Sequence, residues 1–216
     1  MHKAHIIEFS VHCQADFQTP IPVDEAQLTE IAKDICKSSL APYINFGEIS
    51  LIPQDDLFDY ELIIPMFNNS AELTICAQNV TAIFRSGKTS THLKLISECL
   101  VSLVSLAVRS PIKKTVTTFS AAAAFDSQEL YLEYMKQFAN VDLKIGSGGI
   151  VLVADLPEWE GEIRFATEKS VPYPNSIFVS GQATTSKRLS PEFSEAFRKR
   201  FEDVAKHHNL ELGCIE

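Results

Sequence analysis

One short stretch of the chain has the residue types and spacing of half a nucleotide-binding loop. Gly87-Lys88-Thr89 matches the end of a P-loop, with strand-like residues before it and helix-like residues after it. A complete loop reads G-x-x-x-x-G-K-[ST], because its first glycine permits a tight turn and its backbone amides cradle phosphate oxygens. Here Ala82 stands in the place of the first glycine, and the bulky Phe84 lies inside the loop. We therefore expect an ordinary turn between a strand and a helix, and no binding of ATP or GTP.

A second fragment, "IVLVAD" at residues 150–155, has the apolar run and final carboxylate of a strand that holds magnesium in NTPases. A P-loop core, however, requires a parallel sheet with helical crossovers. Hairpin-like strands surround both fragments, so we interpret the two partial matches to NTPase motifs as coincidental. The sequence predicts no nucleotide cofactor.

Other chemistry-bearing residues do not form a recognisable set. His2, His5 and His12 have no Asp, Glu or Cys partners at the spacing of a metal site. The five cysteines are widely spaced, odd in number and never in a CxxC pair, which indicates reduced thiols. No G-x-S-x-G or H-E-x-x-H motif occurs. We expect no catalytic residue, no metal ligand and no cofactor, although an enzyme of an unrecognised class, with a site assembled from distant residues, stays open.

The clearest candidate for a binding site lies in "ADLPEWEGEIRF", residues 154–165. Trp159, the only tryptophan, occurs there beside Glu158, Glu160 and Glu162 at a predicted hairpin tip. A tryptophan ringed by carboxylates suits docking onto a basic protein, because tryptophan is enriched among interface hot spots and charges at the rim speed association. The alternative is that Trp159 folds back onto its own sheet while the glutamates are solvated.

Hydrophobic periodicity predicts alternating strands and helices along the chain. Strands are expected at residues 5–17, 48–52, 60–67, 72–84, 114–125, 150–154, 162–167 and 176–184, and helices at 23–38, 91–108, 127–139 and 191–208. The helix at 91–108 is apolar around most of its circumference, so it is expected to be a central core element. Ser190 and Pro191 are typical of a helix start.

This order predicts an α+β fold of two similar halves. Each half reads strand, helix, three strands, helix, with antiparallel sheets packed against the helices. "RSPIKK" at 109–114 separates a first half at 1–109 from a second at 110–216, and the two are expected to form one compact globular unit. The glycine cluster at 146–149 is expected to be a flexible connection, and a functional loop is the alternative there.

Charge narrows the function classes. The formal net charge is −9, from 28 acidic and 19 basic residues, which opposes binding to nucleic acid or anionic lipid. The chain lacks a long apolar span and a signal-peptide pattern, so we expect a cytoplasmic protein. The leading hypothesis is a non-catalytic protein that binds another protein, in the manner of an immunity protein that inhibits a basic partner.

The alternative function is a small-molecule binding module with its site in a cleft between the halves. Aromatic side chains are the expected lining of such a cleft, with Tyr60, Phe67, Tyr134 and Phe178 as the candidates. The sequence does not show which of these four side chains face the cleft. It also leaves the oligomeric state open.

Overall fold

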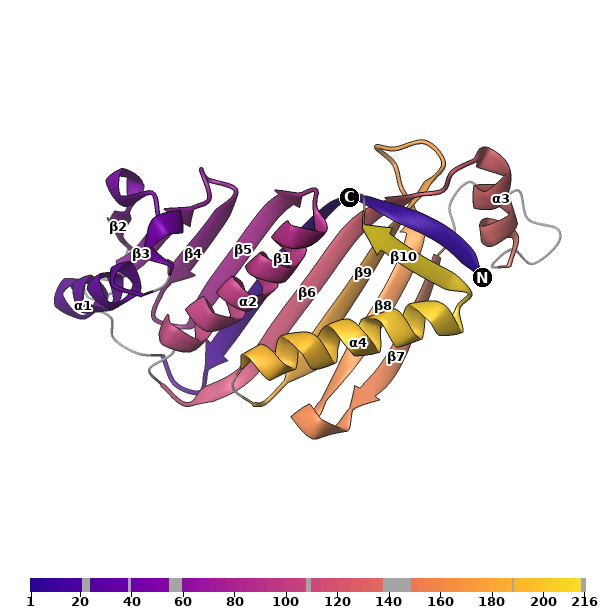
Figure 1. Ribbon diagram of the computed structural model, residues 1–216. Helices are drawn as coiled ribbons and strands as arrows, with labels where there is room; N and C mark the ends of the chain where they lie inside the picture. The colour runs from indigo at the N-terminus through magenta and orange to yellow at the C-terminus, as the bar shows by residue number, and fades with distance from the viewer. Residues whose placement is uncertain are drawn as a thin grey trace.

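The computed structural model describes residues 1–20, 24–38, 40–54, 60–107, 110–137, 149–187 and 189–214. These residues form one sheet of ten strands and four α-helices, joined in places by 3-10 turns (Figure 1). The strands are β1 (His2–Phe17), β2 (Ser50–Pro53), β3 (Tyr60–Met66), β4 (Ala71–Ile75), β5 (Asn79–Gly87), β6 (Ile112–Ala124), β7 (Gly149–Leu156), β8 (Gly161–Lys169), β9 (Ser176–Thr185) and β10 (Leu210–Cys214). The helices are α1 (Glu25–Cys36), α2 (Ser90–Ala107), α3 (Gln128–Lys136) and α4 (Pro191–His207).

The sheet is almost entirely antiparallel. Its strand order is β2-β3-β4-β5-β1-β6-β9-β8-β7, and β10 adds a short parallel pair to the start of β1. The two longest strands, β1 and β6, pair at the centre along nearly their whole length. The predicted α+β class with antiparallel strands is therefore confirmed, and the sheet runs without a break across the predicted boundary near residue 110.

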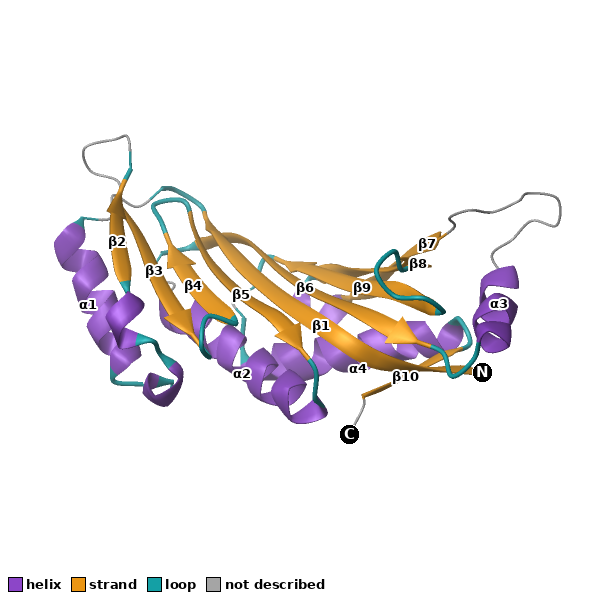
Figure 2. Cartoon of the chain, turned by 90° about the horizontal axis from the view of Figure 1, so that it is seen from above, coloured by secondary structure: helices purple, strands orange, loops and turns teal. Residues whose placement is uncertain are grey.

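Three helices lie on one face of the sheet. Figure 2 shows α1, α2 and α4 beneath the strands, while α3 lies at one end of the sheet. Side chains alternate along the strands, and in the central strands the set that faces the helices is buried, as with Phe9 and Val11 on β1. From α2, Leu100 and Leu103 enter this core, as do the phenylalanines of α4. The expected core role of the helix at 91–108 holds for most of its described apolar side chains, but Leu106 is 48% exposed.

Local sequence explains where two of the helices begin. The carboxylate of Asp24 accepts a hydrogen bond of 2.8 Å from the backbone N–H of Gln27, so α1 starts at the next residue. The hydroxyl of Ser127 accepts one of 3.3 Å from the N–H of Leu130 at the start of α3. Each cap satisfies a backbone donor that has no partner inside the helix.

Two details differ from the predicted elements. The single strand expected at 72–84 is a hairpin, β4 and β5, whose turn between Ile75 and Asn79 contains neither glycine nor proline. The short β10 follows α4 through Asn209, which has a left-handed backbone (φ 58°), and no strand was expected there. None of the helices in the described ranges is long and apolar enough to cross a lipid bilayer.

Candidate functional site

The face of the sheet opposite the helices is open and mostly polar. Along β1 and β6, small side chains such as Ser10, Ser120 and Thr118 point to this face and are half-buried. Ser180 on β9 continues the row across the sheet, because it pairs with Ser120. A floor of small side chains leaves a depression wherever longer ones rise around it.

A bulge near the end of β5 raises one wall of this depression. Between its pairs Phe84↔Val11 and Gly87↔Phe9, β5 has one more residue than β1, and Ser86 adopts a left-handed backbone (φ 61°). A bulge re-aims the side chains at its position. Arg85 and Ser86 consequently both lie exposed at the edge of the depression, although they are neighbours in sequence.

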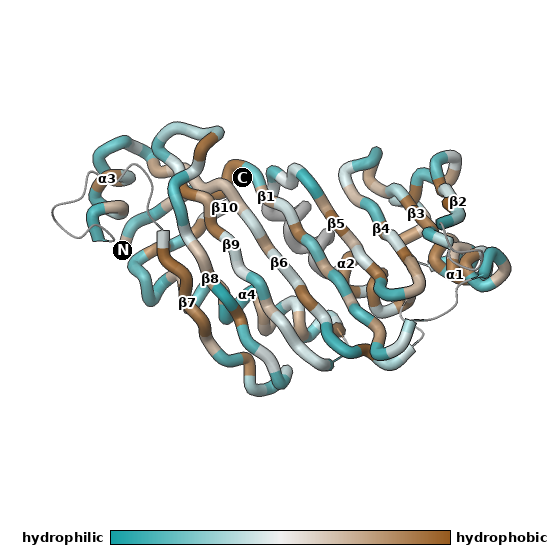
Figure 3. The backbone as a smooth tube through the Cα atoms, turned by 180° about the vertical axis from the view of Figure 1, so that it is seen from behind, coloured by the Kyte–Doolittle hydropathy of each residue, from teal (hydrophilic) through white to brown (hydrophobic). Residues whose placement is uncertain are grey.

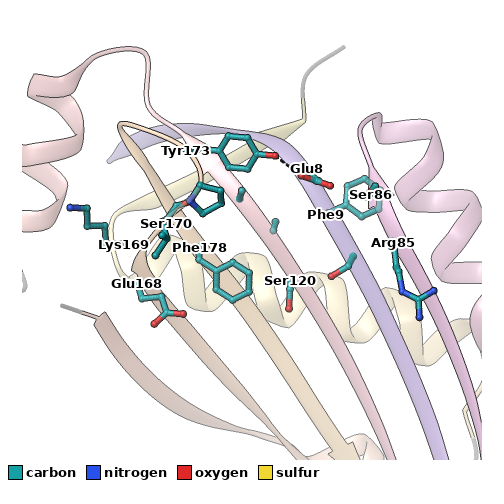
Figure 4. Close-up of a pocket in the computed structure, with 15 residues that line it drawn as sticks. Glu8, Phe9, Arg85, Ser86, Ser120, Glu168, Lys169, Ser170, Tyr173 and Phe178 are labelled. Carbon is teal, nitrogen blue, oxygen red and sulfur yellow. Dashed lines mark hydrogen bonds between the residues drawn. The ribbon is translucent and has the colours of Figure 1, made fainter. Parts of the chain in front are cut away.

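The loop between β8 and β9, residues 170–175, forms the opposite wall. Tyr173 in this loop donates a hydrogen bond of 2.5 Å to the carboxylate of Glu8 on β1, as the dashed line in Figure 4 shows. Because β6 lies between β9 and β1 in the sheet, the loop reaches across β6 to make this contact. Beneath it lies Ala122 on β6, which pairs with Glu8 on one side and Phe178 on the other.

These walls enclose an open cleft of about 440 Å³. Its apolar surface includes Ala122, Phe178 and Pro172, and its charged groups include Glu8 and Arg85. Figure 4 shows the aromatic ring of Phe178 between the carboxylates of Glu168 and Glu8, with Ser120 beside it. The site therefore combines an apolar base with a few polar groups at its rim, which is the usual composition of a ligand site.

The electrostatics of the cleft centre on Glu8. Its pKa is lowered, first by the hydrogen bond from Tyr173, then by one from Ser86, with a smaller contribution from the charge of Lys88. Reciprocally, the hydrogen bond to Glu8 and its negative charge raise the pKa of the Tyr173 hydroxyl. Glu8 is thus an ionised carboxylate at neutral pH with two hydroxyl donors already on it, a group that attracts further hydrogen-bond donors.

Of the four aromatic residues proposed for a cleft between the halves, Phe178 alone lines this one. Phe67 stacks on Tyr43 at a ring-centroid distance of 4.7 Å. Tyr134 is buried beside Phe125, 5.3 Å between centroids, at the end of the sheet where α3 lies. Tyr60 lies on β3, three strands away from β1.

The tip between β7 and β8 holds the residues predicted to bind a partner. Trp159 packs edge-on against Phe193 of α4, with 5.1 Å between ring centroids, and its carbonyl accepts a hydrogen bond from Thr185. Lys187 reinforces the tip through an ion pair of 3.2 Å with Glu160 and a 2.9 Å hydrogen bond to the carbonyl of Glu158. The tryptophan is half-buried against its own fold while the glutamate side chains are exposed. Glu162 begins β8 beside this tip.

The structure also shows the surroundings of the P-loop-like stretch and of the candidate metal ligands. β5 pairs antiparallel with both of its neighbours, so Gly87-Lys88-Thr89 does not occupy the parallel-sheet context of a P-loop. Across the described part of the chain, no three His, Cys, Asp or Glu side chains cluster closely enough to hold a metal ion. His5 instead lies 3.4 Å from the carboxylate of Asp126. Residues 146–148 of the glycine cluster lie outside the described residues, as does a second acidic cluster of the sequence, Asp55, Asp56 and Asp59.

Comparison with known proteins adds little to this picture. No family model matches the chain, and no curated protein matches it. Among solved structures, the S. pombe Pct1 RNA triphosphatase in complex with the Spt5 CTD aligns at 7% identity, covering 94% of this chain and 86% of that chain, with a TM-score of 0.13. A TM-score this low carries no argument about fold or activity, so function is inferred from the cleft itself.

Proposed function

We propose that the protein is a non-catalytic binding protein that takes a small organic molecule in the cleft formed by β1, β6 and β9. The observation that carries this proposal is the open cavity of about 440 Å³ where the two central strands meet. Ordinary ligand pockets measure roughly 300–1,000 Å³. The cleft falls within that range and combines an apolar base with an ionised carboxylate.

The lining favours one kind of ligand chemistry. Glu8 accepts hydrogen bonds, so it favours an ammonium, amide or hydroxyl group of the ligand. Phe178 and Pro172 offer apolar surface to a flat body, and aromatic rings pair well with such a surface. Arg85 and Lys169 at the rim balance Glu8 and Glu168 in charge. We expect a ligand with an aromatic or similar apolar body and a hydrogen-bond-donating group.

The test is a ligand screen with a variant that fills the cleft. A library of small aromatic amines and amides would be screened against the protein by saturation-transfer NMR. Ala122→Leu adds bulk between Glu8 and Phe178 and should abolish the signal of every true ligand. The matched control is Thr184→Leu. Thr184 lies on β9 on the same face of the sheet as Phe178 but outside the cleft, so this change should leave binding unchanged. Binding that survives Ala122→Leu, or the absence of any ligand below millimolar concentration, would overturn the proposal.

We also infer that the chain arose by duplication of one unit. Supporting this, β1 and β6 pair at the centre, each is followed by a helix, and β5 and β9 flank them in corresponding places. α2 and α4 then close the two units. In the first unit four strands follow α1, and in the second unit three strands follow α3, so the predicted count of three strands holds for the second unit alone.

We also propose a cytoplasmic location, on the sequence evidence alone.

A protein partner at the β7–β8 tip is the second candidate function. The exposed carboxylates of Glu158, Glu160 and Glu162 favour it, because a basic surface would meet several charges at once. Glu158→Lys is a better probe than a change at Trp159, since the tryptophan also packs on Phe193. Loss of a basic partner's binding in Glu158→Lys, with unchanged melting temperature, would support this candidate.

A further inference from the structure

The strand β7 has the sequence of an interior strand but lies at the edge of the sheet. Its open side presents Val151 and Val153, which are 62% and 59% exposed. Its helix side presents Ile150, Leu152 and Ala154, which are only half-buried. Strands with apolar side chains on both faces are typical of sheets whose two faces are both covered, so the open face of β7 is a surface suited to contact with another chain. Figure 3 shows β7 brown, that is hydrophobic, over much of its length.

Apart from the charge of Asp155, the edge also lacks the features with which proteins protect edge strands from pairing. Such strands are usually short or carry a lysine, a proline or a bulge. β2, at the opposite edge, has four residues and ends in Pro53. β7 has eight residues, no lysine or proline, and pairs with β8 in unbroken register. Within the described residues, no strand pairs with its outer side.

From these features we infer that β7 binds an extended, basic segment of a protein partner, which adds a strand to the sheet. The backbone N–H and C=O groups on its outer side would supply the ladder hydrogen bonds. Val151 and Val153 would pack against alternate apolar side chains of the added strand. This site shares Glu168 with the rim of the cleft but does not depend on a ligand there.

Charge selects the partner. Asp155 on β7 and its pairing neighbour Glu162 on β8 lie on the same face as the two valines, and Glu168 lies at the far end. Arg164, opposite Val153, is the one cation among these positions. The face is therefore apolar in the middle and acidic at both ends, which suits lysine or arginine at the ends of a partner strand.

A second copy of the chain fits less well. If two copies paired through antiparallel β7 strands, their apolar residues would match best with Leu152 of one copy opposite Leu152 of the other. Val151 would then lie opposite Val153 of the second copy. That register sets Asp155 opposite Gly149 of the second copy, with the second copy's Glu168 directly beyond it. Together with Glu162, three carboxylates would then line up at each end of the joint. Asp155 and Glu162 already lie opposite each other in one copy, and Glu168 of the second copy would add a third like charge to this row, which disfavours the pairing.

The experiment is a selection from a random twelve-residue peptide library displayed on phage, with the intact protein as bait. We expect selected peptides to alternate β-branched residues and to carry lysine or arginine near their ends. The best synthetic peptide should protect the backbone amides of β7 from hydrogen exchange. It should also bind at least ~10-fold more weakly to Val153→Lys, because a lysine on an edge strand blocks pairing.

The matched control is Ile52→Lys, which changes an exposed apolar residue on the opposite edge strand β2. Its peptide affinity should stay within about twofold of the original protein, a difference of about 0.4 kcal/mol. Both variants should keep their melting temperature, since both sites are exposed. Three results would each overturn the inference: no enrichment, enrichment of acidic peptides, or binding that is insensitive to Val153→Lys. So would a dimer in sedimentation that Val153→Lys dissociates, because a second copy would then occupy the edge.

Discussion

Replacing Gly87 by alanine tests why β5 ends in a glycine. An added Cβ at Gly87 would lie 2.1, 2.3 and 2.6 Å from three ring atoms of Phe9, whereas carbon atoms in contact prefer about 3.5–4.0 Å. The ring cannot swing away freely, because Phe9 is 2% exposed and its ring lies near those of Phe84 and Phe119, at centroid distances of 6.1 and 6.0 Å. Gly87 is needed, on this account, to leave room for Phe9.

The expected cost follows from overpacking. Forcing extra atoms into a packed core typically costs about 1–3 kcal/mol, and a clash with three atoms of a confined ring belongs at the upper end. We therefore expect Gly87→Ala to lower the free energy of unfolding by about 3 kcal/mol. For a chain of this length each kcal/mol lowers the melting temperature by roughly 2–4 °C, so the drop should be about 6–12 °C.

Urea unfolding followed by circular dichroism measures this cost, with two controls. Gly47→Ala adds a Cβ that meets nothing within 4 Å and should change stability by less than about 0.5 kcal/mol. In a Phe9→Leu background the clash is relieved, so Gly87→Ala should cost at least ~1 kcal/mol less there than in the original chain. A neutral Gly87→Ala, or an equal cost in both backgrounds, would refute this explanation. A glycine needed only to bind phosphate would give that neutral result in the absence of nucleotide.

Three further outcomes are expected. Tyr173→Phe should lower the melting temperature more at pH 7 than at pH 3. The hydrogen bond that lowers the pKa of Glu8 stabilises the fold above the unfolded pKa of about 4, and this stability is lost as the pH falls through the folded pKa. An equal effect at both pH values in thermal scans would contradict this. Trp159→Ala should cost about 1–2 kcal/mol in urea unfolding, because it removes the aromatic pair with Phe193, and an unchanged midpoint would show that the contact contributes nothing. Calorimetric titration with ATP and magnesium should give no heat of binding, and micromolar affinity abolished by Lys88→Ala would show the opposite.

Local patterns in the sequence predicted most of the elements. The amphipathic helices and the long first strand follow from side-chain periodicity, which depends only on residues close together in the chain. The hairpin between β4 and β5 was missed because its turn, Cys76 to Gln78, has none of the residues that usually mark turns. β10 was missed because five residues with one glycine, "LELGC", give too weak a pattern.

The cleft was not predictable in the same way. Tyr173 and Glu8 are 165 residues apart, and they meet because β6 separates β9 from β1 by a single strand. That neighbourhood depends on strand order and register, which local patterns do not encode. Phe178 was among the predicted lining residues because aromatic residues often line pockets, but nothing in its sequence context distinguished it from Tyr134, which is buried at the end of the sheet.

The bulge in β5 connects the core and the cleft. One extra residue lets the strand turn Arg85 and Ser86 to the open face, where they form a wall of the cleft, and then return Gly87 to the helix side. On that side the missing Cβ of Gly87 leaves space for Phe9, which lies next to Glu8 in β1. Because Phe9 and Glu8 are neighbours in β1, we expect a change that displaces the backbone at Phe9 to shift the Glu8 carboxylate as well. The glycine that suggested a phosphate loop thus contributes to the packing of the strand that carries Glu8, and through it to the cleft in which we propose a ligand binds.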